Sequence, residues 1–398
     1  MRLLPRTPRG TRLLAGLAWA AGTAWLWWVL PPVPRVVIPN AGTFIGFLPD
    51  GASVLIASAD STVTRYDAAT GRELSRFSLG QPATSHFWSA TMSDDGRYLA
   101  WSVTGSSPFS VLVWDLAAGR PLADLPGNLP AFSPDGRRLV TTADGPLGNL
   151  RVWDLTQTPP THRELVADEA RKVESVGSFS FSRDGRLFAA VTGLTPTEAA
   201  IVCWRTDTWE VVGRHAVDVK DALVQGSLEA RFLADGRLAA MYLGAPTLLL
   251  IDATTGDTSR LPLPMSMNVV SPAGRGRYVA AGTMTASVWD VLIERANRYG
   301  VSLPQRTPNA INLVDLSTGR VDASIPGAWA QHNGWSPDGT VLATTVENNG
   351  TIGLWDIPPR KPLAWIVGGS ALLGLALAGL AQRRVRKLRR AHTQGRAG

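Results

Sequence analysis

A five-residue turn motif recurs seven times along this 398-residue chain, and this repeat constrains the fold more than any other feature. In most copies the motif ends in Asp-Gly: the aspartate caps the turn, and the glycine takes a backbone conformation that other residues avoid. Successive copies lie 45, 40, 49, 51, 38 and 65 residues apart, which indicates stacked units of one kind. They read FLPDG ending at Gly51, MSDDG at Gly96, FSPDG at Gly136, FSRDG at Gly185, FLADG at Gly236, VSPAG at Gly274 and WSPDG at Gly339.

Each copy is followed by an apolar run and then by a β-rich segment that ends on an aromatic–aspartate pair or on a weaker equivalent. The clear pairs are Tyr66-Asp67, Trp114-Asp115, Trp153-Asp154, Trp289-Asp290 and Trp355-Asp356, and the weaker ones are Trp204-Arg205, Ile251-Asp252 and Val314-Asp315. A second turn containing glycine and a short outer strand follow most of them. The pattern therefore predicts four antiparallel strands in each unit.

Units of roughly 40–50 residues that end in Trp-Asp resemble the blades of WD-repeat β-propellers. The resemblance covers about residues 33–359. Most units lack the Gly-His that precedes the first strand in eukaryotic members, so the chain is more similar to bacterial WD-like propellers, including those common in planctomycete-type genomes. The resemblance implies an all-β fold, a seven-bladed β-propeller.

The seventh unit lacks an outer strand of its own, because Pro358, Pro359 and Pro362 follow its third strand directly. An open ring would leave an unpaired strand edge. Residues 35–38 are a β-prone run without another place in the repeat. We therefore expect residues 35–38 to close the ring by pairing with residues 351–357.

An apolar segment lies at each end of the propeller region. Residues 13–30 contain no charge and would span roughly 27 Å as a helix, about the thickness of a hydrocarbon core. Residues 363–381 are likewise uncharged. We predict one transmembrane helix at each terminus. Small residues spaced by four suggest that the helices pair in lipid. They are Gly16, Ala20 and Ala24 on the first helix, and Ser370, Gly374 and Ala378 on the second.

The positive charge of the chain is concentrated in its two tails. Residues 1–12 and 382–398 carry eleven of the 39 basic residues and no acid, which leaves the middle with a net charge of −4. By the positive-inside rule both basic tails are cytoplasmic, and the propeller is extracytoplasmic (periplasmic in a bacterium). A mildly acidic domain argues against nucleic-acid binding.

Three other interpretations of the apolar segments stay open. The first segment could be a cleaved signal peptide, since Ala18-Trp19-Ala20 matches a cleavage site, but the apolar core before it is only about five residues long. Both segments could be buried helices of a soluble protein. The second segment with its arginine run could be a C-terminal sorting signal that is removed.

No catalytic constellation is visible in the sequence. We found no glycine-rich phosphate loop, no metal-binding histidine pair and no nucleophile elbow, so we predict no catalytic, cofactor-binding or metal-binding residues and no enzyme activity. The single cysteine, Cys203, lies in an apolar run and is interpreted as a small buried core residue. The repeated aspartates are interpreted as turn-forming residues.

One unit is longer than blade geometry requires. The last interval exceeds the others, and the excess, residues 291–308, follows Trp289-Asp290. Insertions on a propeller map to loops on one face, often the binding face. Arg295, Arg298 and Tyr299 in this insertion are therefore candidate partner-binding residues, because Arg and Tyr often dominate interface energetics.

The leading functional hypothesis is a membrane-anchored, non-catalytic scaffold that binds a protein or peptide partner of unknown identity. One alternative is an enzyme or small-ligand sensor with a site in the central funnel, which clustered charges at equivalent blade positions would favour. The other is a cell-surface protein with a processed C-terminal sorting signal.

Overall fold

The chain folds into two units, which are described separately. A computed structural model describes residues 8–58, 60–79, 90–103, 109–143, 149–165, 176–192, 199–217, 228–242, 247–263, 268–272, 277–283, 310–326, 328–346 and 350–394. One unit is formed by Pro34–Pro358, and the other combines Met1–Val33 with Pro359–Gly398.

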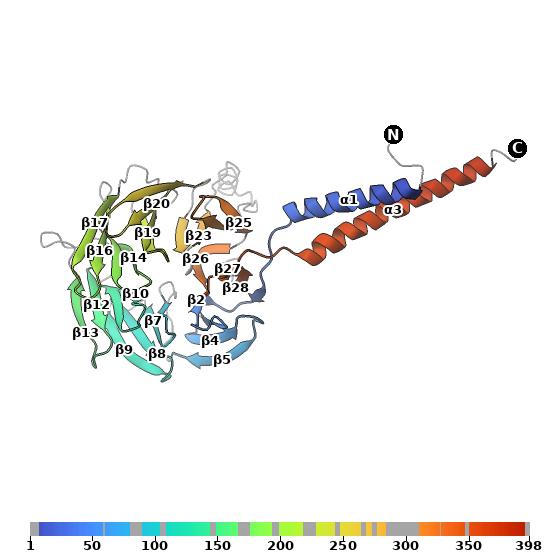
Figure 1. Ribbon diagram of the computed structural model, residues 1–398. Helices are drawn as coiled ribbons and strands as arrows, with labels where there is room; N and C mark the ends of the chain where they lie inside the picture. Colours follow the sequence, from blue (N-terminus) through green and yellow to red (C-terminus); the bar gives the residue numbers. More distant parts are fainter. Residues whose placement is uncertain are drawn as a thin grey trace, which may run out of the picture. The chain divides into compact units, whose positions relative to one another are not determined.

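The larger unit contains seven four-stranded antiparallel sheets among its described residues, arranged as the blades of a propeller (Figure 1). This confirms the predicted all-β, seven-bladed fold. Blade 1 consists of β2 (Thr43–Phe47), β3 (Ser53–Ala57), β4 (Thr62–Asp67) and β5 (Glu73–Ser78); blade 2 of β6 (Thr91–Met92), β7 (Tyr98–Val103), β8 (Ser110–Asp115) and β9 (Arg120–Pro126); blade 3 of β10 (Asn128–Phe132), β11 (Arg138–Thr142), β12 (Leu150–Asp154) and β13 (Thr161–Leu165).

The remaining blades repeat this order. Blade 4 consists of β14 (Val176–Phe181), β15 (Leu187–Thr192), β16 (Ala199–Arg205) and β17 (Val211–Val217); blade 5 of β18 (Leu228–Phe232), β19 (Arg237–Tyr242), β20 (Thr247–Asp252) and β21 (Thr258–Pro262); blade 6 of β22 (Asn268–Pro272), β23 (Tyr278–Thr283), β24 (Ala310–Asp315) and β25 (Val321–Pro326); blade 7 of β26 (Ala328–Trp335), β27 (Val341–Val346), β28 (Thr351–Asp356) and β1 (Val36–Ile38). The first strands of neighbouring blades contact one another around the ring, so these strands line the central channel.

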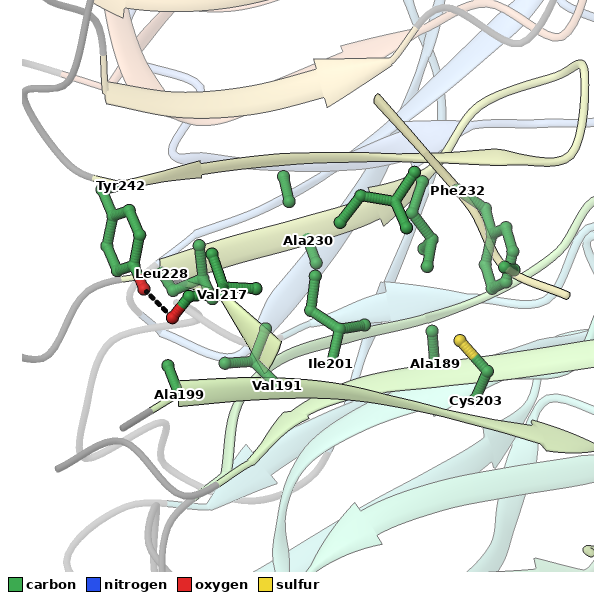
Figure 2. Close-up of a cluster of buried hydrophobic side chains, with 14 residues drawn as sticks. Ala189, Val191, Ala199, Ile201, Cys203, Val217, Leu228, Ala230, Phe232 and Tyr242 are labelled. Carbon is green, nitrogen blue, oxygen red and sulfur yellow. Dashed lines mark hydrogen bonds between the residues drawn. The ribbon is translucent and has the colours of Figure 1, made fainter. Parts of the chain in front are cut away.

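The core lies between blades, because successive side chains of a strand point to opposite faces of its sheet. In β16, Ala199, Ile201 and Cys203 pack toward blade 5, whereas Val202 and Trp204 pack toward blade 3. Figure 2 shows the first of these clusters, where the Tyr242 hydroxyl donates to Val217 O (3.4 Å). Cys203 is fully buried in this cluster, which confirms its interpretation as a core residue.

The outer strand of blade 7 comes from the other end of the propeller sequence. β1 pairs antiparallel with β28, with Val36 opposite Leu354 and Ile38 opposite Ile352. The structure thus has the ring closure expected from the spare β-prone run at residues 35–38. The buried side chains of Val36 and Ile38 join the cluster between blades 7 and 1.

Blade 6 differs from its expected strand boundaries. Its third strand, β24, ends at Asp315, with Tyr278 of β23 opposite that residue. Trp289-Asp290 therefore does not end the third strand, and it lies outside the described residues. The local turn explains the assignment: Asp315 Oδ1 accepts from Ser317 N (2.8 Å), as the aspartates that end other third strands do in their turns. The insertion consequently connects β23 to β24.

The smaller unit contains α1 (Pro8–Val29) and α3 (Leu363–Gln394), which pack against each other. The pairing is antiparallel. Lys361 Nζ donates to Leu30 O (2.6 Å), and Thr23 Oγ1 donates to Ser370 Oγ (2.8 Å), which donates in turn to Ile366 O (2.6 Å). Hydrogen bonds between polar side chains thus reinforce the apolar contact.

The predicted contact face is correct for α3 and wrong for α1. Ser370 and Gly374 are buried and Ala378 is half-buried in α3, whereas Gly16, Ala20 and Ala24 are exposed. The contact face of α1 instead contains half-buried Gly22, Thr23 and Leu26. The physical reason is the Thr23–Ser370 hydrogen bond, which selects this face over the small-residue stripe.

Among the described residues, one helix is long and apolar enough to cross a membrane. This is Leu363–Leu380 of α3, with a mean hydropathy of 2.0. α1 does not meet the same criterion, because it contains four tryptophans and also includes Arg9 and Arg12. The prediction of a spanning helix at each terminus is therefore not supported for residues 13–30.

Candidate functional site: the mouth of the central channel

The recurring turns share a hydrogen-bonding arrangement that fixes the end of each first strand. In blade 2, Ser93 Oγ donates to Asp95 Oδ1 (2.6 Å) and accepts from Tyr98 N (2.9 Å). Asp95 Oδ1 also accepts from Arg97 N (3.0 Å). The same serine-to-aspartate bond recurs at 2.5–2.7 Å in blades 3, 4 and 7. The aspartates are thus turn-forming residues, as interpreted from the sequence.

Neighbouring turns pack closely around the channel. Gly96 has a φ of +69°, and a Cβ placed there would lie 2.6 Å from Pro49 Cδ in the turn of blade 1. Only glycine meets both the backbone and the steric requirement. Turns of neighbouring blades thus touch at this part of the rim, and the middle residue of each described turn has a defined position on it.

A cavity of about 590 Å³ opens inside this rim. Its volume is in the range of roughly 300–1,000 Å³ that is typical of ligand pockets. Among the described residues, the first strands of six blades contribute to its lining, which places it at one mouth of the central channel. The middle residues of six turn motifs line it: Pro49, Asp94, Pro134, Arg183, Ala234 and Pro337.

Aromatic side chains form part of the cavity wall. Phe47, Phe132, Phe179 and Phe232 come from four different first strands, and all are mostly buried. Half-buried Trp335 adds a further aromatic surface from blade 7. Because the phenylalanine rings are packed between the blades, they give the cavity a rigid wall and leave little of their own surface for a ligand.

The charged lining is asymmetric. Asp94 in blade 2 and Arg183 in blade 4 occupy a motif position that is proline or alanine in the other five turns. Crowding by surrounding protein raises the pKa of the Asp94 carboxyl, and the positive charge of Arg183 partly offsets this increase. Because a raised pKa means that the ionised carboxylate is incompletely solvated, a cation placed beside Asp94 would be stabilised.

A second arginine faces the same cavity from blade 5. Arg231 Nη1 donates to Phe179 O (3.2 Å), which holds its guanidinium against blade 4. The first strands of these two blades are also joined through serine side chains. Ser178 Oγ accepts from Ala230 N (2.6 Å), and Ser180 Oγ accepts from Phe232 N (3.1 Å). Arg183 and Arg231 therefore belong to one rigid section of the rim.

Three residues of the insertion were predicted from the sequence as partner-binding. Arg295, Arg298 and Tyr299 lie outside the described residues, in the connection between β23 and β24. The described strands β23 and β24 show on which face of the propeller this connection begins and ends. The turn motifs join first to second strands, so the connection from second to third strand leaves from the opposite face.

Asp94, Arg183 and Arg231 were missed in the sequence analysis. A signal for the first two was available, because aligning the seven motifs shows Pro, Asp, Pro, Arg, Ala, Pro and Pro at the middle position. Two opposite charges at a position otherwise occupied by proline or alanine depart from what the turn itself requires. Within the described part of the chain, no group of three or more His, Cys, Asp or Glu side chains is arranged to hold a metal ion.

Comparison with known proteins identifies the fold. The β-propeller domain of Cps50 (Swd1) from Myceliophteria thermophila is similar with a TM-score of 0.57 at 16% identity, covering 79% of this chain and 97% of that domain. Hydrazine synthase from Kuenenia stuttgartiensis is similar with a TM-score of 0.57 at 15% identity, covering 80% of this chain and 96% of the other. No protein-family model matches the sequence, and neither does any curated protein. The likenesses therefore show a propeller fold, and the bacterial WD-repeat family stays a prediction.

Proposed function

We propose that this protein is a membrane-anchored binding module that holds a partner protein or peptide at the mouth of its propeller channel. The observation that carries the proposal is the pair of opposite charges, Asp94 and Arg183, at a motif position on the cavity rim that is proline or alanine in the other turns. A rigid cavity with few polar groups is the usual form of a binding site. The proposal assigns no catalytic step to this site.

Anchoring is proposed through both helices of the smaller unit. The apolar part of α3 is long enough to span a bilayer. α1 runs antiparallel beside it, with Leu26 next to Gly369 and Thr23 bonded to Ser370. Exposed Leu, Val and Trp side chains on α1 and α3 suit a lipid environment. We propose a two-helix hairpin whose basic ends are cytoplasmic and whose propeller is extracytoplasmic.

Labelling of introduced cysteines tests this topology. Native Cys203 is buried, so the Leu74→Cys variant on exposed β5 would carry the reactive thiol. A membrane-impermeant maleimide should label Leu74→Cys in intact right-side-out vesicles, and a fluorescent protein fused after Gly398 should remain protected from added protease. Wild type is the matched control. Labelling that requires permeabilisation would place the propeller in the cytoplasm and overturn the proposal.

Site-specific crosslinking in cells tests the binding site. Pro337 on the rim and Leu122 on outer strand β9 are both exposed and can each be replaced by a photo-crosslinking amino acid. We expect a discrete adduct from position 337, none from position 122, and loss of the adduct when Asp94→Arg and Arg183→Asp are combined. An adduct that survives the charge exchange would mean that the rim charges do not select the partner.

The insertion that connects β23 to β24 provides a second candidate surface. Residues 291–308, including Arg295, Arg298 and Tyr299, stay a proposal derived from the sequence. Replacing residues 292–307 by a short Gly-Ser bridge should leave folding nearly unchanged, since loop-closure entropy grows slowly with length. If this deletion abolishes the adduct from position 337, the insertion and the channel mouth both contribute to one partner complex. If the adduct persists, the channel mouth binds without the insertion.

A further inference from the structure

We propose that the basic end of the helical hairpin binds the phosphate groups of acidic phospholipids at the bilayer surface. This basic end consists of Arg9 and Arg12 of α1 together with residues 383–390 of α3. The inference rests on the proposed function, because it presupposes that the hairpin anchors the protein in a bilayer. It adds the class of lipid that the anchor selects.

The smaller unit carries positive charge without acidic side chains to balance it. Arg360 and Lys361 add to the eleven basic residues of the two tails, and neither Met1–Val33 nor Pro359–Gly398 contains Asp or Glu. The counter-charges for these cations must therefore come from solution or from a partner. A concentrated positive charge of this kind attracts an anionic partner.

Both helices place their arginines at the same end of the hairpin. The hydrogen bond between Thr23 and Ser370 fixes the level at which the antiparallel helices meet. At a rise of about 1.5 Å per residue, Arg12 lies about 17 Å from that level along α1, and Arg383 lies about 20 Å from it along α3, in the same direction. The cations of the two helices therefore form one group.

The apolar part of the hairpin sets the depth of this group in a bilayer. At the other end of the hairpin, Trp25, Trp27 and Trp365 are 61%, 52% and 76% exposed. Exposed tryptophans suit a membrane–water interface. Trp365 and Arg383 are separated by about 27 Å along α3, close to the roughly 30 Å thickness of a hydrocarbon core. With the tryptophans at one interface, Arg383 lies at the depth of the phosphate groups of the other.

The basic segment of α3 is itself helical, because α3 continues past its apolar part to Gln394. With about 3.6 residues per turn, four of its basic residues follow one side of the helix. They are Arg383, Arg386, Lys387 and Arg390. A guanidinium group can bind a phosphate through two parallel N–H donors. This side of the helix can therefore bind more than one acidic headgroup.

A lipid is favoured over a soluble anion by the point at which the cations begin. The apolar part of α3 ends at Leu380, and Arg383 follows within one helical turn. Lipid phosphates are therefore concentrated next to these side chains as soon as the helix is inserted. A zwitterionic headgroup brings a cation of its own to the same place, whereas an acidic headgroup does not. Acidic phospholipids should consequently bind more tightly.

Electron paramagnetic resonance of spin-labelled lipids tests the inference with the full-length protein in phosphatidylcholine vesicles. Wild type should bind labelled phosphatidylglycerol about fivefold or more tightly than labelled phosphatidylcholine at low salt. This preference should fall at about 1 M salt, because exposed charges are screened. Replacing chloride by inorganic phosphate at equal ionic strength should leave the preference unchanged. A loss of preference in phosphate would mean that a free anion, not a lipid, occupies the basic end.

Charge-removing variants locate the contact. Combining Arg383→Gln, Arg386→Gln and Lys387→Gln should lower the preference for phosphatidylglycerol by about threefold or more. Combining Arg383→Lys with Arg386→Lys keeps the charge and should retain most of the preference.

The matched control removes three positive charges from the propeller instead. Arg72, Arg120 and Arg320 are exposed there, and their combined replacement by Gln should leave the preference unchanged. Equal binding of the two labelled lipids by wild type would overturn the inference, as would an unchanged preference in the Gln variant of α3. Neither result bears on anchoring, which the cysteine labelling at position 74 decides separately. An anchored protein without a lipid preference would thus contradict this inference alone.

Discussion

Arg35 and Asp356 form an ion pair that closes the propeller ring, with Arg35 Nη1 3.3 Å from Asp356 Oδ1. Arg35 Nη2 also donates to Ala68 O (3.1 Å) in blade 1. Asp356 ends the third strand of blade 7, where other blades use the corresponding aspartate to cap a turn. Because the chain leaves blade 7 here, the aspartate pairs instead with an arginine that immediately precedes the closing strand.

Removing this arginine should destabilise the propeller. Both side chains of the pair are largely shielded from solvent, so Arg35→Gln should lower the free energy of unfolding by about 1–3 kcal/mol. Urea unfolding followed by tryptophan fluorescence measures this change. Arg76→Gln is the matched control, because the Arg76–Glu73 pair is exposed and should contribute nothing measurable. Equal losses of unfolding free energy in the two variants would show that the Arg35–Asp356 pair does not stabilise the ring closure.

The parts of the fold that depend on local chemistry were predictable from the sequence. The seven turns were recognisable because each keeps the final glycine and most keep the aspartate before it, and the serine–aspartate bond lies within the motif in blades 2, 3, 4 and 7. Ring closure was predictable because residues 35–38 were β-prone and blade 7 lacked a strand. The end of the third strand of blade 6 was misjudged, because Trp289-Asp290 has the sequence of an aromatic–aspartate pair. The glycine turn that follows Asp315 marks the real strand end.

The parts that depend on non-local contacts were not predictable in the same way. That Asp94 and Arg183 line one cavity depends on blades 2 and 4 facing one channel, which no single motif contains. The contact face of α1 was missed because small residues occur on more than one of its faces. Only the partner side chain, Ser370 on α3, distinguishes the face with Thr23 from the face with Gly16.

Stability should fall in acid through the turn aspartates. The hydrogen bond from Ser182 lowers the pKa of the Asp184 carboxyl, as does the bond from Thr156 for Asp154. A lowered folded-state pKa stabilises the protein above the unfolded value of about 3.9, and this contribution is lost as pH falls through the folded pKa. The urea midpoint should therefore decline below about pH 4.

A variant isolates one of these contributions. Asp184→Asn should destabilise the propeller at pH 7, and the difference from wild type should shrink toward zero as Asp184 becomes protonated in both states. Asp124→Asn, at an exposed site on β9, is the control and should be neutral at either pH. A destabilisation by Asp184→Asn that is independent of pH would show that the charge of the carboxylate is not involved.

Cys203 should be unreactive in the folded protein. Burial raises the pKa of its thiol to about 12, so almost no thiolate exists at pH 8. Ellman's reagent should report no accessible thiol in the native protein and one per chain in urea. Reaction at comparable rates in both conditions would mean that blades 4 and 5 separate readily at this interface.

The buried indoles of the blades differ in their hydrogen bonding. Trp153 Nε1 donates to Thr141 Oγ1 (3.0 Å) in blade 3, and Trp355 Nε1 donates to Thr344 Oγ1 (2.9 Å) in blade 7. Within the described residues, Trp204 Nε1 of blade 4 is buried without a partner. The strand register explains the difference, because Ala190 occupies the position in β15 that the two threonines occupy in their blades.

Introducing a hydroxyl at position 190 with Ala190→Thr should therefore stabilise blade 4. Ala190 is fully buried, so a larger side chain brings some overpacking, and Ala190→Val matches the size of Ala190→Thr without its hydroxyl. Thr should be more stable than Val by about 1–2 kcal/mol, because the hydroxyl satisfies a buried donor. Conversely, Thr141→Val should cost about 1–3 kcal/mol by leaving Trp153 Nε1 unpaired. Urea unfolding of the four proteins, wild type included, measures both effects. If Ala190→Val equals or exceeds Ala190→Thr in stability, the indole of Trp204 gains nothing from a partner, and packing alone determines this position.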